Sequence, residues 1–157
     1  MNIKLLVIGK TDDKNLLQLI QVYESRLKHY IKFDLEIIPD IKNVKNLSEV
    51  QQKEKEGNLI LKKIGSSDQL ILLDENGKTF KSTEFAQFLQ KKMNSGIKQL
   101  VLVIGGPYGF SETVYKKAVG KISLSKMTFS HQMIRLIIVE QLYRGFTILK
   151  NEPYHHE

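Results

Sequence analysis

Short apolar runs alternate along the whole chain with longer segments whose apolar residues repeat every three or four positions. The first run covers residues 3–8, and the segment after it repeats at helical spacing. Its apolar positions are Leu16, Ile20, Tyr23 and Leu27. This alternation is typical of a parallel sheet covered by helices, so the pattern predicts an α/β fold.

The same pattern predicts five strands and five helices. We expect strands at 3–8, 33–37, 69–73, 100–104 and 122–124. We expect helices over 16–27, after each of Ser48, Ser82 and Ser111, and over 131–150. Ser48 with Gln51 three residues on forms a capping box, and Asn76-Gly77 predicts a turn after the third strand.

Parallel connections are nearly always right-handed, which restricts how these elements can be joined. We therefore expect a doubly wound, Rossmann-like, mostly parallel sheet with helices on both faces. No internal repeat or linker interrupts the pattern, so residues 1–157 are expected to form a single domain.

The last helix is apolar on two sides. One stripe along the helix is formed by Ile134, Ile137, Ile138 and Leu142. Much of the remaining helix surface is formed by Met133, Leu136, Val139 and Tyr143. Such a helix needs burial on both sides. Its own sheet can cover one side, and a second copy of the chain covering the other predicts a homodimer. The alternative is a helix enclosed in the core of its own chain.

Composition narrows the functional classes. The chain has no cysteine, which excludes disulfides, thiol nucleophiles and thiolate zinc sites. It has neither a signal-peptide pattern nor a run long enough to span a membrane, so we expect a cytoplasmic protein without a membrane partner. The net charge of +7 favours a polyanionic partner such as nucleic acid. The alternative is that lysine pairs such as Lys62-Lys63 merely face solvent.

Three loops follow the later strands and are the places where a ligand is expected: 73 onward, 105–109 and 125–130. The segment 105–109, which we call the glycine loop, does not match the G-x-G-x-x-G pattern of dinucleotide-binding proteins. It is also not followed by the lysine of a P-loop. Gly105-Gly106 lets a ligand approach the backbone closely, although a tight turn without a ligand would use the same residues. The histidines lack ligand spacing, so no metal site is expected.

Taken together, these motifs resemble the small SPOUT methyltransferases of the RlmH type, also called YbeA-like. The resemblance extends over the whole chain and is densest in IGGPYG at 104–109, in SLSKMTFSHQMIRLIIVEQLYRGF at 123–146 and in NEPYHHE at 151–157. It implies an α/β domain whose C-terminal segment forms a trefoil knot, the SPOUT fold. It also implies an S-adenosylmethionine site built from knot loops at a homodimer interface.

The resemblance further implies which residues form the site. It places the cofactor contacts on Leu73, Gly105, Leu124, Ser125, Lys126, Met127, Thr128 and Phe129. It places the catalytic residues, which face the substrate, on His131, Arg144, Tyr154 and His155. Some of them are expected to come from the C-terminal tail, residues 151–157, of the partner subunit. Two positions depart from the family: Ser130 stands where proline is common, and Tyr108 where an acidic residue is common. Ser130 is expected to cap the last helix instead.

The implied substrate is a pseudouridine in helix 69 of 23S ribosomal RNA, methylated at N3 on assembled ribosomes. Arg144 cannot act as a base, so we expect it to bind phosphate or stabilise negative charge. His155 is the expected proton acceptor, although His131 could take that role, and Tyr154 could stack on the target base. The alternatives are a SPOUT methyltransferase with another RNA target and a non-catalytic ribosome- or RNA-binding module.

Overall fold

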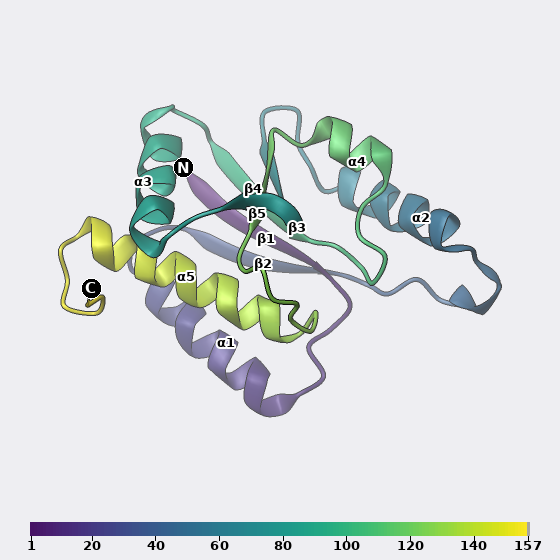
Figure 1. Ribbon diagram of the computed structural model, residues 1–157, viewed down its shortest axis with the longest axis horizontal. Coiled ribbons are helices and arrows are strands. Elements are labelled where there is room, and N and C mark those ends of the chain that lie inside the picture. The colour runs from purple at the N-terminus through teal and green to yellow at the C-terminus, as the bar shows by residue number, and fades with distance from the viewer. Residues whose placement is uncertain (157) are drawn as a thin grey trace.

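The computed structural model describes residues 1–156, which form a five-stranded sheet with helices on both faces (Figure 1). The strands are β1 (Asn2–Ile8), β2 (Phe33–Ile38), β3 (Gln69–Thr79), β4 (Gln99–Ile104) and β5 (Gly120–Ser123). The helices are α1 (Lys14–Leu27), α2 (Glu49–Leu61), α3 (Ser82–Asn94), α4 (Glu112–Lys117) and α5 (Met133–Leu149), with a short 3-10 helix at Val44–Asn46.

The sheet is parallel throughout, in the order β2-β1-β4-β3-β5. Its register aligns the ends of four strands, because Val7 and Leu73 both pair with Ile104, and Leu73 also pairs with Ile122. The loops that follow these residues therefore leave the sheet at one edge. The predicted parallel α/β sheet with helices on both faces is confirmed.

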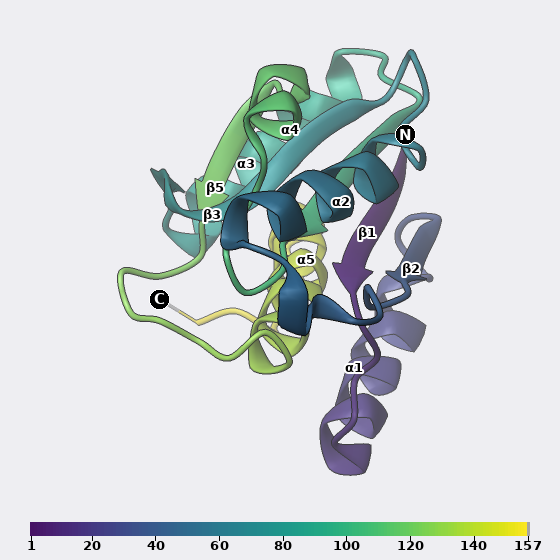
Figure 2. The same cartoon turned by 90° about the vertical axis from the view of Figure 1, so that its right-hand side faces the viewer.

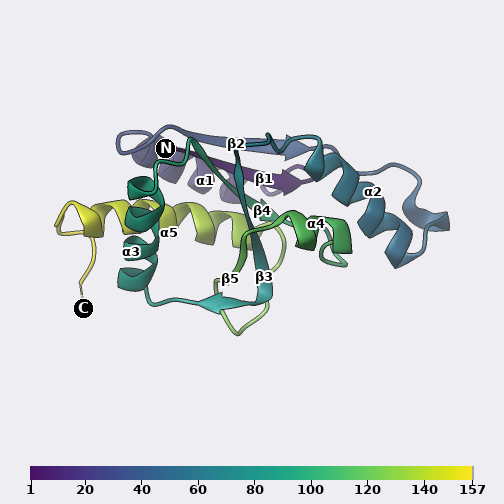
Figure 3. The same ribbon diagram turned by 90° about the horizontal axis from the view of Figure 1, so that it is seen from above.

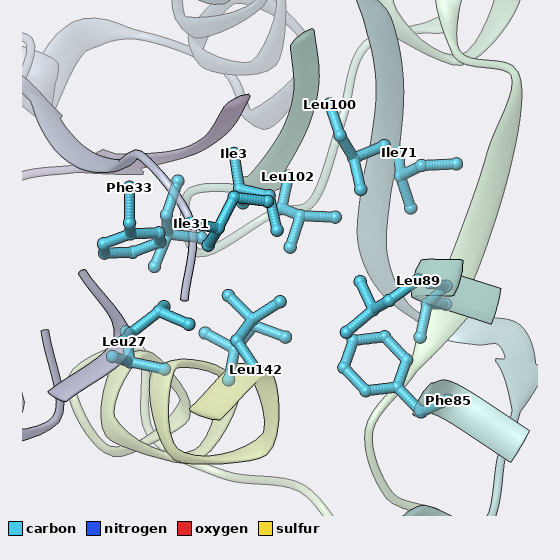
Figure 4. Close-up of a cluster of buried hydrophobic side chains, with 14 of the residues drawn as sticks. Ile3, Leu27, Ile31, Phe33, Ile71, Phe85, Leu89, Leu100, Leu102 and Leu142 are labelled. Carbon is cyan, nitrogen blue, oxygen red and sulfur yellow. The ribbon is translucent and has the colours of Figure 1, made fainter. Parts of the chain in front are cut away.

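Alternating side chains of β4 divide the core into two layers. Leu100, Leu102 and Ile104 face the larger layer, formed with α1, α3 and α5 (Figure 4). Val101 and Val103 face the smaller layer, formed with α2 and α4. All five residues are nearly or completely buried, as expected for a strand covered on both faces. Figure 3 shows α5 running lengthwise beside α1, with α3 crossing near its end.

The predicted serine caps are confirmed for the two helices in which the serine hydroxyl bonds to the start of its own helix. Ser48 and Gln51 form the predicted capping box, with both hydrogen bonds present. Ser111 caps α4 by accepting the N–H of Val114. The prediction for Ser82 was wrong: α3 already includes Ser82, whose hydroxyl instead donates to Gln141 of α5 at 3.0 Å. Glu84 receives the N–H of Lys81 and closes the start of that helix.

The predicted turn at Asn76-Gly77 was also wrong. β3 continues to Thr79, and its pairing with β5 shifts register between Leu73 and Lys78. Gly77 passes against the β5 backbone, where a Cβ would lie only 2.5 Å from the carbonyl carbon of Ile122. The glycine therefore allows two backbone segments to touch instead of reversing the chain.

α5 is buried by its own chain along one side. Ile138, Val139 and Leu142 are fully buried among residues of α1, α3 and the sheet. Gly145 comes so close to α3 that a Cβ there would lie 2.9 Å from Leu89. The other side, with Met133, Leu136, Ile137 and Tyr143, remains partly or fully exposed, so the homodimer that would cover it stays a prediction.

Arg135 ties the beginning of α5 to the end of β1. This side chain is 2% exposed, and its guanidinium donates to the carbonyls of Ile8 and Gly9, to the hydroxyl of Thr11 and to the carbonyl of His131. Burial lowers the pKa of Arg135, yet a guanidinium remains charged in proteins. One cation therefore satisfies backbone groups from two segments more than 120 residues apart in the sequence.

No helix in the described part of the chain is long and apolar enough to cross a membrane.

We expect Arg135→Met to destabilise the protein by about 2–4 kcal/mol, because it leaves several buried carbonyl groups without a donor. Urea unfolding followed by circular dichroism measures this change. Lys116→Met is the control, since Lys116 forms only an exposed ion pair with Glu112 and should change stability little. Equal midpoints for the two variants would contradict the role assigned to Arg135.

Candidate functional site

A cavity of about 490 Å³ opens at the carboxyl ends of β3, β4 and β5. Its walls come from the three segments that the sequence indicated, because the pairing of these strands brings them to one edge. The segment from Leu73 onward is the continuation of β3 and not the loop that was predicted. All eight predicted cofactor residues line it: Leu73, Gly105, Leu124, Ser125, Lys126, Met127, Thr128 and Phe129. The volume lies within the range of small-molecule sites, about 300–1,000 Å³.

The glycine loop forms one wall as a tight turn. Gly109 has a positive φ of 79° and donates its N–H to the carbonyl of Gly106 at 3.1 Å. A Cβ on Gly105 would lie 3.1 Å from the ring of Phe110, and one on Gly106 would collide with the carboxylate of Glu56. A Cβ on either glycine would therefore require Phe110 or the Glu56 carboxylate to shift, and both glycines line the cavity.

The opposite wall is the loop between β5 and α5, which stands out from the body of the molecule (Figure 2). Ser125 shapes its beginning: its carbonyl accepts from the hydroxyl of Ser123, and its hydroxyl accepts the N–H of Met127. Met127 is 77% exposed, and Phe129 is also exposed. Ser130 accepts the N–H of Met133 and so stabilises the turn that leads into α5, although the N-cap position of the helix itself is Gln132.

The continuation of β3 adds polar groups that the sequence prediction missed. Asp74 accepts hydrogen bonds from the N–H of Asn76 and from the hydroxyl of Tyr115 at 2.5 Å. Burial, together with the bond to Asp74, raises the pKa of Tyr115 to about 12. Asp74, Glu75 and Tyr115 all line the cavity and offer acceptors and a donor for ribose or amino groups. Tyr115 carried no signal in the sequence, since only tertiary packing brings α4 to this edge.

The four predicted catalytic residues fall in two places. His131 lines the cavity, whereas Arg144, Tyr154 and His155 form a cluster at the far end of α5. Ile134 also lines the cavity, and Arg144 lies ten residues beyond it, about 15 Å along a helix that rises 1.5 Å per residue. One copy of the chain therefore does not bring the cofactor residues and the Arg144 cluster together.

Glu140 organises that second cluster. Its Oε1 accepts from Nε and Nη2 of Arg144 and from the hydroxyl of Tyr154 at 3.0, 2.7 and 3.0 Å. The guanidinium lies 4.7 Å from the centre of the Tyr154 ring, and its Nη1 lies 3.3 Å from Nδ1 of His155. The hydrogen bond with Glu140 raises the pKa of Arg144, so this cation is permanent.

Helix α1 and the turn after it contribute side chains to the cluster that sequence reasoning did not identify. The hydroxyls of Tyr23 and Tyr154 lie 3.2 Å apart, and Tyr30 donates to Glu152. Burial, followed by hydrogen bonds to Tyr23 and Glu140, raises the pKa of Tyr154. The tail is therefore held against its own α1 and α5 up to His155 and is not frayed. Glu157, the last residue of the tail motif, lies outside the described residues.

Comparisons with known proteins agree over the full length. A family model described as a predicted SPOUT methyltransferase matches residues 1–155. The ribosomal RNA large subunit methyltransferase H of Flavobacterium johnsoniae is 76% identical over 157 residues, which is the whole of both chains. Proteins of the same name from Flavobacterium psychrophilum and Bacteroides thetaiotaomicron are 77% and 58% identical, again over the whole of both chains.

Proposed function

The chain belongs to the SPOUT methyltransferase family, and from this premise we propose that it transfers the methyl group of S-adenosylmethionine to ribosomal RNA of the large subunit. The observation that carries the proposal is the cavity at the strand ends, whose walls contain every residue predicted to contact the methyl donor. Relatives that match the whole chain are named for this activity. This places the protein among enzymes and not among non-catalytic RNA-binding modules.

The residues present fit the methyl donor. Gly105 carries no side chain on the cavity wall, and the loop at 124–129 lines the opposite wall, where backbone N–H and C=O groups would pair with the edge of an adenine ring. When bound, S-adenosylmethionine supplies a methyl group activated by a sulfonium. The protein must then hold the acceptor in line and help to remove its proton.

The acceptor we propose is N3 of a pseudouridine in helix 69 of 23S ribosomal RNA, on assembled ribosomes in the cytoplasm. The net charge of +7 favours such a polyanion. Arg144 would bind phosphate or stabilise negative charge developing on the base, and Tyr154 would stack on the base. No metal is needed for these steps, because the donor is already activated.

The hydrogen bonding of His155 limits its role as proton acceptor. A guanidinium only donates, so Nδ1 of His155 accepts from Arg144, and the neutral ring carries its hydrogen on Nε2. His155 can take a proton at Nδ1 only once Arg144 has turned away toward the RNA. His131, which lines the cavity, is the other candidate for this role.

We further propose that the working unit is a homodimer in which the Arg144 cluster of one copy completes the cavity of the other. The separation of the two groups within one chain supports this arrangement. Exposed apolar side chains around the cavity also support it, because such patches mark interaction surfaces. They are Tyr108, Met127, Phe129 and Met133.

The finer fold proposed for residues 1–157 is a single domain with a C-terminal trefoil knot. The family resemblance implies the knot.

The proposed function predicts that the purified protein binds S-adenosylmethionine with a dissociation constant in the range of about 1–100 µM. It also predicts that the protein methylates ribosomes at one pseudouridine. Calorimetry and mass spectrometry of ribosomal RNA, from cells with and without the protein, measure the two properties. A methyl group lost from another nucleotide would replace the proposed target, and folded protein that binds no donor would exclude the activity.

The two groups of residues predict a division of labour. Arg144→Ala and His155→Ala should leave donor affinity nearly unchanged and slow methylation of ribosomes by about a hundredfold or more. Gly105→Val should weaken donor binding first, because its side chain meets Phe110 and displaces the loop. Dissociation constants and single-turnover rates separate these effects. Loss of donor binding in Arg144→Ala as severe as in Gly105→Val would refute the division.

The composite dimer predicts complementation between two inactive variants. When Arg144→Ala and Gly105→Val chains are unfolded together and refolded, about half of the dimers should be mixed, and each mixed dimer should contain one intact site. Methylation should then recover to about a quarter of the wild-type rate. Each variant refolded alone is the control. No recovery, with mixed dimers demonstrated by mass spectrometry, would show that each site is built within one chain.

A further inference from the structure

An unpaired buried carboxylate lies directly behind the glycine loop. Glu56 of α2 is 3% exposed, and its Oε1 accepts from the side-chain amide of Gln52 at 2.9 Å. Its Oε2 has no hydrogen-bond partner in the described residues. A Cβ built on Gly106 would lie 2.2 Å from this Oε2, so the carboxylate rests against the side of Gly106 that carries no side chain.

Gly106, which contacts this carboxylate, also lines the wall of the cavity. Burial raises the pKa of Glu56, the amide of Gln52 opposes this, and the neighbouring charges of Asp40 and His131 act in opposite directions. Buried polar atoms in folded proteins are nearly always paired, so an orphaned carboxylate oxygen at this position requires an explanation.

The chemistry of the proposed reaction offers an explanation for the unpaired oxygen of Glu56. The methyl donor carries a positive sulfonium, whereas the demethylated product carries a neutral thioether, so the two ligands differ by one positive charge. When ionised, a carboxylate beside the wall of the cavity attracts the sulfonium and not the thioether. Asp74 and Glu75 also line the cavity, but they are partly or fully exposed, and water and salt screen their charges.

Resting on the proposed function, we propose that Glu56 is a specificity-determining residue that favours the methyl donor over its demethylated product by electrostatic attraction across Gly106. This role also gives a functional meaning to glycine at position 106, because any side chain there would displace the carboxylate. After transfer the attraction is lost, which favours exchange of the product for new donor.

The test compares the dissociation constants of S-adenosylmethionine and S-adenosylhomocysteine, measured by calorimetry on the full-length protein. The preference for the donor is the ratio of the two dissociation constants. In Glu56→Gln this ratio should be about tenfold smaller than in wild type, which is the scale expected for one charge several ångströms from the ligand in a partly buried site. Glu56→Met, which removes the orphaned polar atom and should fold well, should give the same fall. Glu54→Gln is the matched control, because Glu54 is exposed on the same helix and should leave the preference unchanged.

A ratio of affinities distinguishes this role from a structural one. If Glu56 only shaped the loop, its substitution would weaken the binding of both ligands equally and leave the ratio of their dissociation constants unchanged. That result would overturn the proposal. Binding of both ligands to wild type, with an unaltered ratio in Glu56→Gln and Glu56→Met, leaves the proposed function standing while removing this inference. Binding of neither ligand to folded wild type contradicts the proposed function itself.

Discussion

The burial of α5 between α1, α3 and the sheet is the constraint on which the site depends. Ile138, Val139 and Leu142 have no exposed surface, so the helix cannot shift without exposing apolar area to water. Arg135 fixes the beginning of the helix to the end of β1 by hydrogen bonds to two backbone carbonyls. Because α5 begins at the cavity wall and carries Arg144 further along, its placement determines where these candidate site residues lie.

The beginning of α5 closes the loop that forms one wall of the cavity, and its other end carries Glu140 and Arg144. A rigid helix of this length keeps the two groups about 15 Å apart in one chain. The tail follows Arg144 as one hydrogen-bonded unit, since Tyr154 binds Glu140 and also contacts Tyr23 of α1. A unit of this kind can be presented to a neighbouring copy without rearrangement, which reduces the entropic cost of completing a site.

The glycine loop meets requirements from two directions. On the protein side, Phe110 and the carboxylate of Glu56 leave no room for a β-carbon. On the cavity side, the absent side chains leave the backbone open to a ligand. The choice posed by the sequence, between a tight turn and close approach of a ligand, was therefore not exclusive, since one geometry serves both.

The features that the sequence alone predicted correctly are local. Apolar runs such as 100–104 predicted the buried strands, the serines at 48 and 111 predicted helix starts, and family motifs predicted the cavity residues. Each of these signals lies within a few neighbouring residues, because strand period and capping hydrogen bonds act at that range.

Tertiary structure decided the features that depend on distant neighbours. Gly77 continues a strand because the backbone of Ile122 lies against it, and Ser82 donates to Gln141 instead of capping its helix. The burial of Glu56 and the meeting of Tyr23 with Tyr154, 131 positions apart, leave no local pattern. Residues so far apart in the sequence meet only because the whole chain packs densely in three dimensions. The spacing of residues along the sequence does not show which of them will come into contact.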